Sequence, residues 1–144
     1  MTTRRRTTDA GSASLELVVI GTVLLAFMGL AAGLGRVAVA SGTVTDAAAA
    51  AARAASLART PAEAQNAAAG VARATLLQGG LHCESTNVSV DTTGFSAPLG
   101  QPAEVRAEVV CVVRLSDLGL PGISGSKSLR ADFVSVLDPY RSRS

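Results

Sequence analysis

The sequence predicts an α+β protein, in which a long N-terminal transmembrane helix continues as an alanine-rich helix. A second helix and a small three-stranded antiparallel sheet with one disulfide follow. Three observations lead to this fold class. An uncharged apolar run fills residues 17–35, alanine dominates residues 46–78, and alternating apolar and polar residues follow residue 80. In 144 residues there is room for one small domain beside a membrane segment.

The apolar run between residues 17 and 35 predicts the transmembrane helix. It carries no charge and a single hydroxyl group, and at ~1.5 Å rise per residue its length matches a hydrocarbon core of ~30 Å. A soluble helix of this length would show a polar stripe, which the run lacks. Three arginines at positions 4–6 precede the run, and only Arg36 follows it closely. The positive-inside rule therefore predicts a single-pass inner-membrane protein with a cytoplasmic N-terminus and residues 36–144 outside.

Small residues recur within this segment. Gly29 and Gly33 form a GxxxG pair, and Ala31 and Gly35 repeat the spacing. Such pairs allow two helix backbones to approach closely in a membrane. Glycine is common in membrane helices in any case, so a helix-packing site and ordinary membrane composition both explain the pattern.

Three interpretations compete for the N-terminus. A conventional signal peptide would be cut before Ser41, after Ala38 and Ala40 at the usual spacing, but its apolar region would exceed the usual ~7–15 residues. A twin-arginine signal is disfavoured because apolar residues do not directly follow the arginines at 4–6. The second interpretation is an uncleaved anchor, and the third is a pilin-type leader.

The third interpretation rests on Gly11 and Glu16. A short basic leader, a glycine and, five residues later, a glutamate beside an apolar run resemble the leader of type IV prepilins. The resemblance implies that a membrane-embedded prepilin peptidase cuts between Gly11 and Ser12, on the cytoplasmic side, and that the helix stays in the product. It also implies that the Glu16 carboxylate pairs with the N-terminal amine of a neighbouring subunit. The alternative is a glutamate that reaches water at the membrane interface, because an ionised carboxylate deeper in the hydrocarbon would need a partner.

Alanine predicts that the helix continues beyond the membrane. Residues 36–59 contain a run of alanines and no proline, and alanine has the highest helix propensity. The TPAE sequence at residues 60–63 is a helix start, with a threonine cap, a proline in the first turn and a capping-box glutamate. We expect a second helix from Pro61 to about Leu77, ended by a double glycine. We call the extension of the first helix at residues 36–59 the stalk. Because alanine buries little surface, the stalk needs neighbouring chains or the downstream domain to cover it.

Three segments after the double glycine alternate apolar and polar residues, as half-buried strands do. Residues 104–115 are the clearest case, with valines and Cys111 on one face and charged residues on the other. Residues 87–91 and 126–137 are the other two. Connections rich in glycine and proline separate them. We therefore expect a small antiparallel sheet whose apolar face packs against the second helix or the stalk.

The two cysteines, Cys83 and Cys111, would be oxidised outside the cytoplasmic membrane, and their spacing suits a structural disulfide. Such a bridge stabilises a domain by ~2–4 kcal/mol. His82, the sole histidine, adjoins Cys83. One histidine and two cysteines are too few ligands for a typical zinc site. We expect no metal, no cofactor and no catalytic residues. The net charge of +2 and the 3% aromatic content also disfavour nucleic acid as a partner.

The whole chain resembles the TadE-like proteins, particularly those of actinobacteria. These proteins are minor pilins or pseudopilins of the tight-adherence type IV pilus. The segments that carry the resemblance are AGSASLELVV, RAASLART, VVCVVRLSDLGLPG and VLDPYR. The resemblance implies a non-enzymatic accessory subunit. Its partners would be the cytoplasmic membrane, a prepilin peptidase, other pilus subunits and assembly-platform proteins, with no small-molecule substrate. Two departures are Gly21, near where the family often has proline, and Leu17, where major pilins have tyrosine. The second departure and the length argue against a major pilin.

We expect four parts in the chain. They are a basic cytoplasmic leader at 1–11, the transmembrane helix at 12–36, alanine-rich extracytoplasmic helices at 37–80 and a disulfide-closed β domain at 81–144. The predicted function is a minor pilin, processed after Gly11, that contributes to pilus assembly or adhesion. The alternative is an unprocessed membrane-anchored structural or assembly factor. A secreted enzyme is disfavoured because the sequence contains no apparent nucleophile–histidine–acid set, phosphate loop or carboxylate pair.

Overall fold

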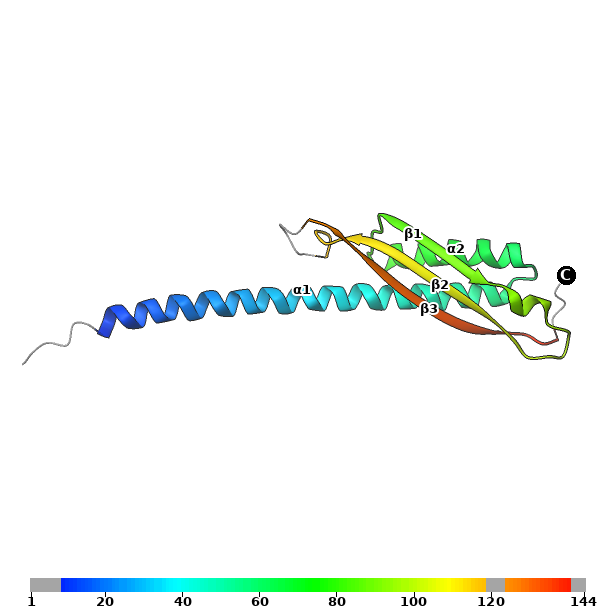
Figure 1. The fold of residues 1–144 in the computed structure, drawn as a ribbon, viewed down its shortest axis with the longest axis horizontal. Helices are drawn as coiled ribbons and strands as arrows, with labels where there is room; N and C mark the ends of the chain where they lie inside the picture. The colour runs from blue at the N-terminus through cyan, green and yellow to red at the C-terminus, as the bar shows by residue number, and fades with distance from the viewer. Residues whose placement is uncertain (1–8, 119–123, 141–144) are drawn as a thin grey trace, which may run out of the picture. The chain divides into compact units, whose positions relative to one another are not determined.

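The computed structural model describes residues 9–118 and 124–140, with side chains from residue 13 onward. These residues form two α-helices, a short 3-10 helix and a three-stranded sheet (Figure 1). The chain divides into two compact units, residues 1–35 and residues 36–144, and each is described by itself. Most of the predicted leader, including the arginines at 4–6, lies outside the described residues.

Helix α1 extends from Asp9 to Leu57, so the apolar run and the start of the alanine-rich region belong to one helix. This continuity confirms the predicted extension of the N-terminal helix. In the first unit the large apolar side chains of α1 are exposed, from Leu15 to Leu34. By length and composition, α1 is the one helix in the described part of the chain that could cross a membrane. The chain therefore fits a single-pass membrane protein.

Helix α2 spans Pro61–Gln78 and begins at the predicted signal. The Thr60 hydroxyl accepts a hydrogen bond from the Glu63 backbone N–H at 3.2 Å, and the Glu63 carboxylate accepts one from the Arg59 N–H at 3.0 Å. Both bonds satisfy backbone donors at the helix start. At the other end, Gly80 has a φ of 70°, a conformation that glycine adopts without strain. The chain can therefore turn from α2 toward the sheet.

Strands β1 (Ser85–Asp91), β2 (Ala103–Arg114) and β3 (Ser126–Leu137) form a sheet in the order β1-β2-β3, with both neighbouring pairs antiparallel. The predicted three-stranded antiparallel sheet is confirmed, and β1 begins two residues before its predicted start. A 3-10 helix, η1 (Thr93–Ser96), lies between β1 and β2, where the alternation of residues predicts only a connection. A Cβ at Gly94 would overlap the Glu104 carbonyl oxygen, so this turn requires glycine.

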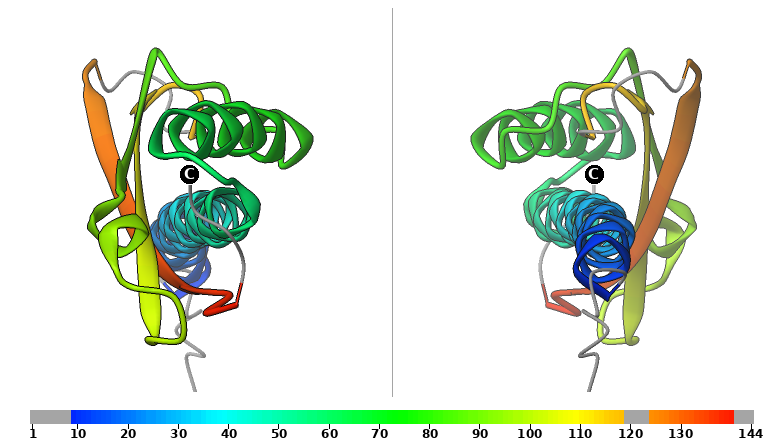
Figure 2. Two further views of the ribbon diagram at one scale, coloured as in Figure 1. Left: turned by 90° about the vertical axis from the view of Figure 1, so that its right-hand side faces the viewer. Right: turned by 90° about the vertical axis from the view of Figure 1, so that its left-hand side faces the viewer.

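The apolar face of β2 is completely buried. From Val105 on, its odd-numbered residues have no exposed surface: Val105, Ala107, Val109, Cys111 and Val113. Within the second unit, α2 and the C-terminal part of α1 lie on one side of the sheet (Figure 2), and they contribute to the same apolar cluster as these residues. The predicted packing of the sheet against the helices is confirmed.

Alanine provides most of the helical part of this core. Buried alanines line both helices and join the valines of β2 in one cluster: Ala40, Ala47, Ala48, Ala51, Ala52, Ala55, Ala64, Ala68 and Ala72. Side chains this small allow close approach. At the end of α2, a Cβ on Gly79 would overlap the Thr43 side chain of α1. The chain's own domain therefore covers much of the alanine-rich stalk.

Polar side chains make two further connections between the helices and the sheet. The Gln65 amide of α2 donates to the Val88 carbonyl at 2.7 Å and accepts from the Val90 N–H at 3.0 Å. It therefore satisfies backbone groups of β1 as a neighbouring strand would. The Ser56 hydroxyl of α1 lies 3.1 Å from the Ser135 hydroxyl of β3. The edge strands β1 and β3 are thus each tied to a helix.

Candidate functional site

The residues that the sequence singles out for processing lie at the start of α1. Because α1 begins at Asp9, the peptide bond between Gly11 and Ser12 has helical backbone on both sides. In an α-helix each carbonyl accepts a hydrogen bond from the N–H four residues later, so this segment would have to unwind to enter a protease site. Glycine has a low helix propensity, so Gly11 makes this unwinding easier.

Glu16 stands one turn beyond Ser12. Its side chain is exposed, and it carries the only charge between residues 13 and 35. Within the described residues, no ion pair or hydrogen bond engages its carboxylate. Apolar neighbours surround it, and Leu15, Val19 and Ile20 line a shallow depression together with it. The structure therefore places one unpaired acid among apolar side chains, as the sequence predicts, and its pairing with an amine stays a prediction.

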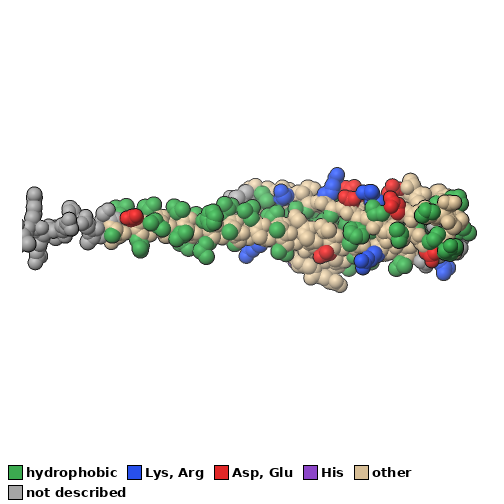
Figure 3. Space-filling view, turned by 90° about the horizontal axis from the view of Figure 1, so that it is seen from below, with side chains coloured by type: hydrophobic (Ala, Val, Ile, Leu, Met, Phe, Trp, Pro, Cys, Tyr) green, Lys and Arg blue, Asp and Glu red, His purple; other side chains and the backbone are tan. Residues whose placement is uncertain are grey.

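The apolar surface around Glu16 continues along the helix. Leu17, Val18, Leu25, Phe27 and Met28 are each about two-thirds or more exposed. Figure 3 shows hydrophobic side chains along the N-terminal stretch of α1, whereas Lys, Arg, Asp and Glu side chains gather over the second unit. Exposed apolar surface of this extent marks a membrane or protein contact.

The predicted helix-packing glycines differ in exposure. Gly29 is exposed, and a Cβ built there would meet nothing within 4 Å, so the monomer does not require glycine at this position. Gly33 is buried. With one chain present, the use of the Gly29/Gly33 pair in helix association stays a prediction.

The disulfide prediction is confirmed. Cys83, two residues before β1, is bonded to Cys111 in β2, and their Cα atoms are 5.5 Å apart. The bond joins the edge of the sheet to its central strand. Cys111 has no exposed surface, whereas Cys83 is only half-buried. Because the bridge fixes the entry to β1, it stabilises the second unit by limiting the unfolded chain.

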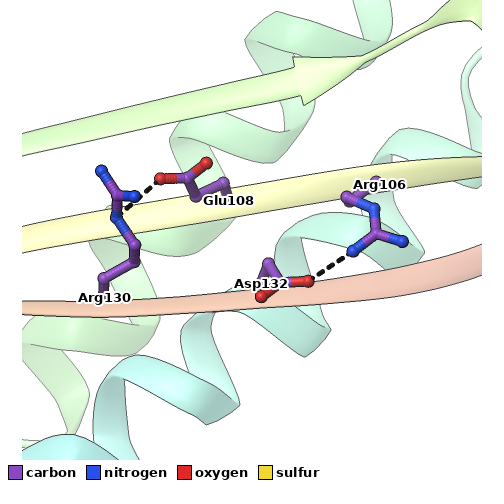
Figure 4. A network of polar contacts seen from close by, with 4 residues as sticks. All are labelled: Arg106, Glu108, Arg130 and Asp132. Carbon is purple, nitrogen blue, oxygen red and sulfur yellow. Dashed lines mark hydrogen bonds and ion pairs between the residues drawn. The ribbon is translucent and has the colours of Figure 1, made fainter.

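Several charged residues of the sheet form ion pairs. On the face away from the helices, Arg106 bonds Asp132 at 2.7 Å and Arg130 bonds Glu108 at 2.9 Å (Figure 4). Arg114 bonds Glu84 at 2.7 Å, and the Glu84 carboxylate raises the pKa of the Arg114 guanidinium. Among the described residues, no group of three His, Cys, Asp or Glu side chains could hold a metal ion.

Two of the polar contacts within the second unit cannot be predicted from the sequence. Gln65 lies in an alanine-rich helix and Ser135 on an otherwise ordinary strand, and their partners Val90 and Ser56 are distant in the chain. The only signal at Gln65 is a polar residue between Ala64 and Ala68, both of which are buried. Helical periodicity alone does not indicate what such a side chain contacts.

One known protein family matches the N-terminal part of the chain. The family model described as TadE-like protein matches residues 11–53, a segment that begins at Gly11 and contains Glu16 and the apolar run. No curated protein and no solved structure matches this chain. The actinobacterial subtype stays a prediction. Residues 11–53 are therefore similar to the TadE-like family, which the sequence motifs also indicate.

Proposed function

We propose that this protein is a non-enzymatic minor pilin or pseudopilin of a tight-adherence type IV pilus system. The observation that carries the proposal is the TadE-like match over residues 11–53, which contains the exposed apolar surface of α1 between Leu15 and Leu34. In this function, α1 first anchors the subunit in the cytoplasmic membrane with the arginine-rich N-terminus inside. The disulfide-closed unit then lies outside, where it is available to other pilus subunits, to assembly-platform proteins or to an adhesion target.

Processing after Gly11 is the next step of the proposal. A prepilin peptidase cuts the Gly11–Ser12 bond on the cytoplasmic side and leaves Ser12 with a free α-amine. The first turn of α1 unwinds for the cut, and the low helix propensity of Gly11 makes this unwinding easier. A bulky side chain at position 11 should block a close-fitting peptidase site, so Gly11→Leu should leave the full-length precursor in cells.

Glu16 would act after processing. In a helical filament its carboxylate leaves lipid and meets neighbouring helices, where an unpaired charge is costly. The Ser12 amine of an adjacent subunit would neutralise it and set the axial register between helices. The Ser12 amine of the same chain competes, because residues four apart lie on the same face of a helix. Gly29 and Gly33 would allow the helices to approach.

The experiment combines N-terminal sequencing with subunit capture. In cells with an intact pilus system, wild-type protein should begin at Ser12. Glu16→Ala and Glu16→Gln should be inserted and cut normally, because neither step needs the charge, but should capture fewer pilus subunits. Mature protein beginning at Ser41 would refute the pilin leader, and equal capture by all three forms would reduce Glu16 to an interfacial residue.

A second function, an unprocessed membrane-anchored assembly factor, has one observation in its favour. The start of α1 at Asp9 places the Gly11–Ser12 bond within helical backbone, which protects it from proteolysis. Intact Met1 in protein from pilus-producing cells, together with normal pilus assembly, would support this alternative.

A further inference from the structure

The two halves of the disulfide have different access to the surface. Cys111 lies on the buried face of the central strand and has no exposed surface. Cys83 lies outside the strands and is half-buried. It lines a cavity of about 200 Å³, which opens to the surface. A reagent in solution can therefore reach the Cys83 side of the disulfide through this cavity, whereas Cys111 is closed to it.

The cavity suits a small thiol or the cysteine-bearing tip of another protein. Its walls are mainly apolar and come from Leu76, Leu77 and Leu81, and Arg73 is also part of the lining. Arg73 has no hydrogen-bond or ion-pair partner among the described residues, so it can attract an anionic thiolate. An apolar lining with one cation is suited to an attacking sulfur with a short side chain or peptide around it.

We infer that Cys83 is the site of thiol–disulfide exchange in this protein, and that its ligand class is a thiolate. The thiolate attacks the Cys83 sulfur, a bond forms between the two sulfurs, and the Cys83–Cys111 bond breaks. The electron pair leaves on the Cys111 sulfur, which takes up a proton. A second thiol can then displace Cys83 and complete the two-electron reduction, with the two thiols oxidised to a disulfide. The reverse sequence, with an oxidised dithiol protein as electron acceptor, forms the native bond through Cys83.

This inference goes beyond the pilin proposal and does not depend on it. It concerns how extracytoplasmic oxidoreductases would form, repair or reduce the bond in the folded protein. Burial of Cys111 selects Cys83 as the sulfur that is attacked and leaves Cys111 as the leaving group. Attack at an accessible sulfur is a general determinant of exchange rate.

The test uses the native full chain in detergent micelles, with two probes. One is reduced glutathione, and the other is a thioredoxin-type dithiol protein whose resolving cysteine is replaced, so that its mixed disulfide persists. After a brief reaction, acid quench, unfolding and alkylation with N-ethylmaleimide, trypsin releases Cys83 on residues 74–106 and Cys111 on residues 107–114. Mass spectrometry then locates each adduct.

We expect the adduct on residues 74–106 and the maleimide on residues 107–114, with at least about a tenfold preference. In guanidinium the preference should disappear, because unfolding exposes both sulfurs. Adduct formation by glutathione alone would identify a small-thiol site, and formation by both probes a site that also admits a protein. Equal labelling of the two peptides in the native protein, labelling of Cys111 or no reaction with either probe would overturn the inference.

A matched pair of variants tests the route through the cavity. Leu77 lines the cavity and is 63% exposed, whereas Leu99 is 65% exposed and does not line it. Leu77→Trp should narrow the entrance and slow exchange at Cys83 several-fold, and Leu99→Trp should leave the rate unchanged. Both positions are exposed enough for the fold to tolerate tryptophan. Equal rates for the two variants would show that the cavity is not the route.

Discussion

The two halves of helix α1 use apolar residues in opposite ways. From Leu15 to Leu34 the large side chains point outward and are exposed. From Ala40 to Ala55 the buried residues are alanines and one valine, Val44, and they pack into the core of the second unit. The backbone is one continuous helix throughout, so the difference lies only in the size and placement of side chains.

This difference shows how one helix can serve two environments. Bulky side chains provide the apolar surface that lipid or neighbouring subunits cover. Alanines provide a surface on which another helix and a sheet can approach closely, since the attraction depends on contact distance. The stability of the second unit can depend on side-chain size, on buried polar contacts, on close approach of the helices or on surface charge. Four predictions distinguish these contributions.

The largest expected effect concerns size. Ala51 has no exposed surface, so Ala51→Leu should overpack the core and lower the free energy of unfolding by about 1–3 kcal/mol. The same substitution at Ala26, which is exposed in the first half, should leave the unfolding of the second unit unchanged. Pulse proteolysis of the full chain in detergent measures both. Equal effects would show that the halves do not differ in packing.

A smaller effect is expected at Gln65, which tests polarity. Gln65→Ala should lower the free energy of unfolding by about 1–2 kcal/mol, because it leaves the Val88 carbonyl and the Val90 N–H without their amide partner. Its neighbour Asn66 is exposed, so Asn66→Ala is the control. Hydrogen exchange at Val90 should accelerate in the first variant only. Unchanged exchange there would contradict the role given to Gln65.

Two glycines should respond to the same substitution with opposite signs. Gly79→Ala places a Cβ against Thr43 and should destabilise the second unit by about 1 kcal/mol. Gly42→Ala adds a methyl group that meets nothing in a helix interior, and should stabilise by about 0.5–1 kcal/mol. Urea unfolding followed by circular dichroism gives both values. If Gly79→Ala were also stabilising, the close approach of the end of α2 to Thr43 would not limit the side chain at this position.

The smallest effect is expected from the charge pairs on the outer face of the sheet. Arg106 and Asp132 are each more than half exposed, so Arg106→Gln should change the free energy of unfolding by less than about 0.5 kcal/mol. The change should shrink further at high salt. Arg73→Gln, at an exposed arginine without an ion-pair partner among the described residues, is the control. A loss above 1 kcal/mol would mean that charge, rather than packing, maintains the sheet.

Much of the fold can be predicted from short-range patterns. The TPAE signal at residues 60–63 and the period-two alternation in β2 place α2 and the central strand within one residue of their observed starts. The helix expected from residue 12 begins three residues earlier, at Asp9. The Cys83–Cys111 bond follows from the presence of two cysteines and the extracytoplasmic location that the sequence predicts for them. Of the candidate site, the sequence identifies Gly11, Ser12 and Glu16 through the resemblance to TadE-like proteins, and their roles in cleavage and assembly stay predictions.

The sequence by itself determined the kinds of element and their order, because helix propensity, capping and strand alternation depend on neighbours a few residues apart. Only the tertiary structure decided which alanines are buried, that Gln65 reaches β1, and that Cys83 rather than Cys111 faces a cavity. Each of these depends on contacts between segments far apart in the chain. The residues next to an alanine, a glutamine or a cysteine in the sequence do not indicate which distant segment it will contact in the folded protein.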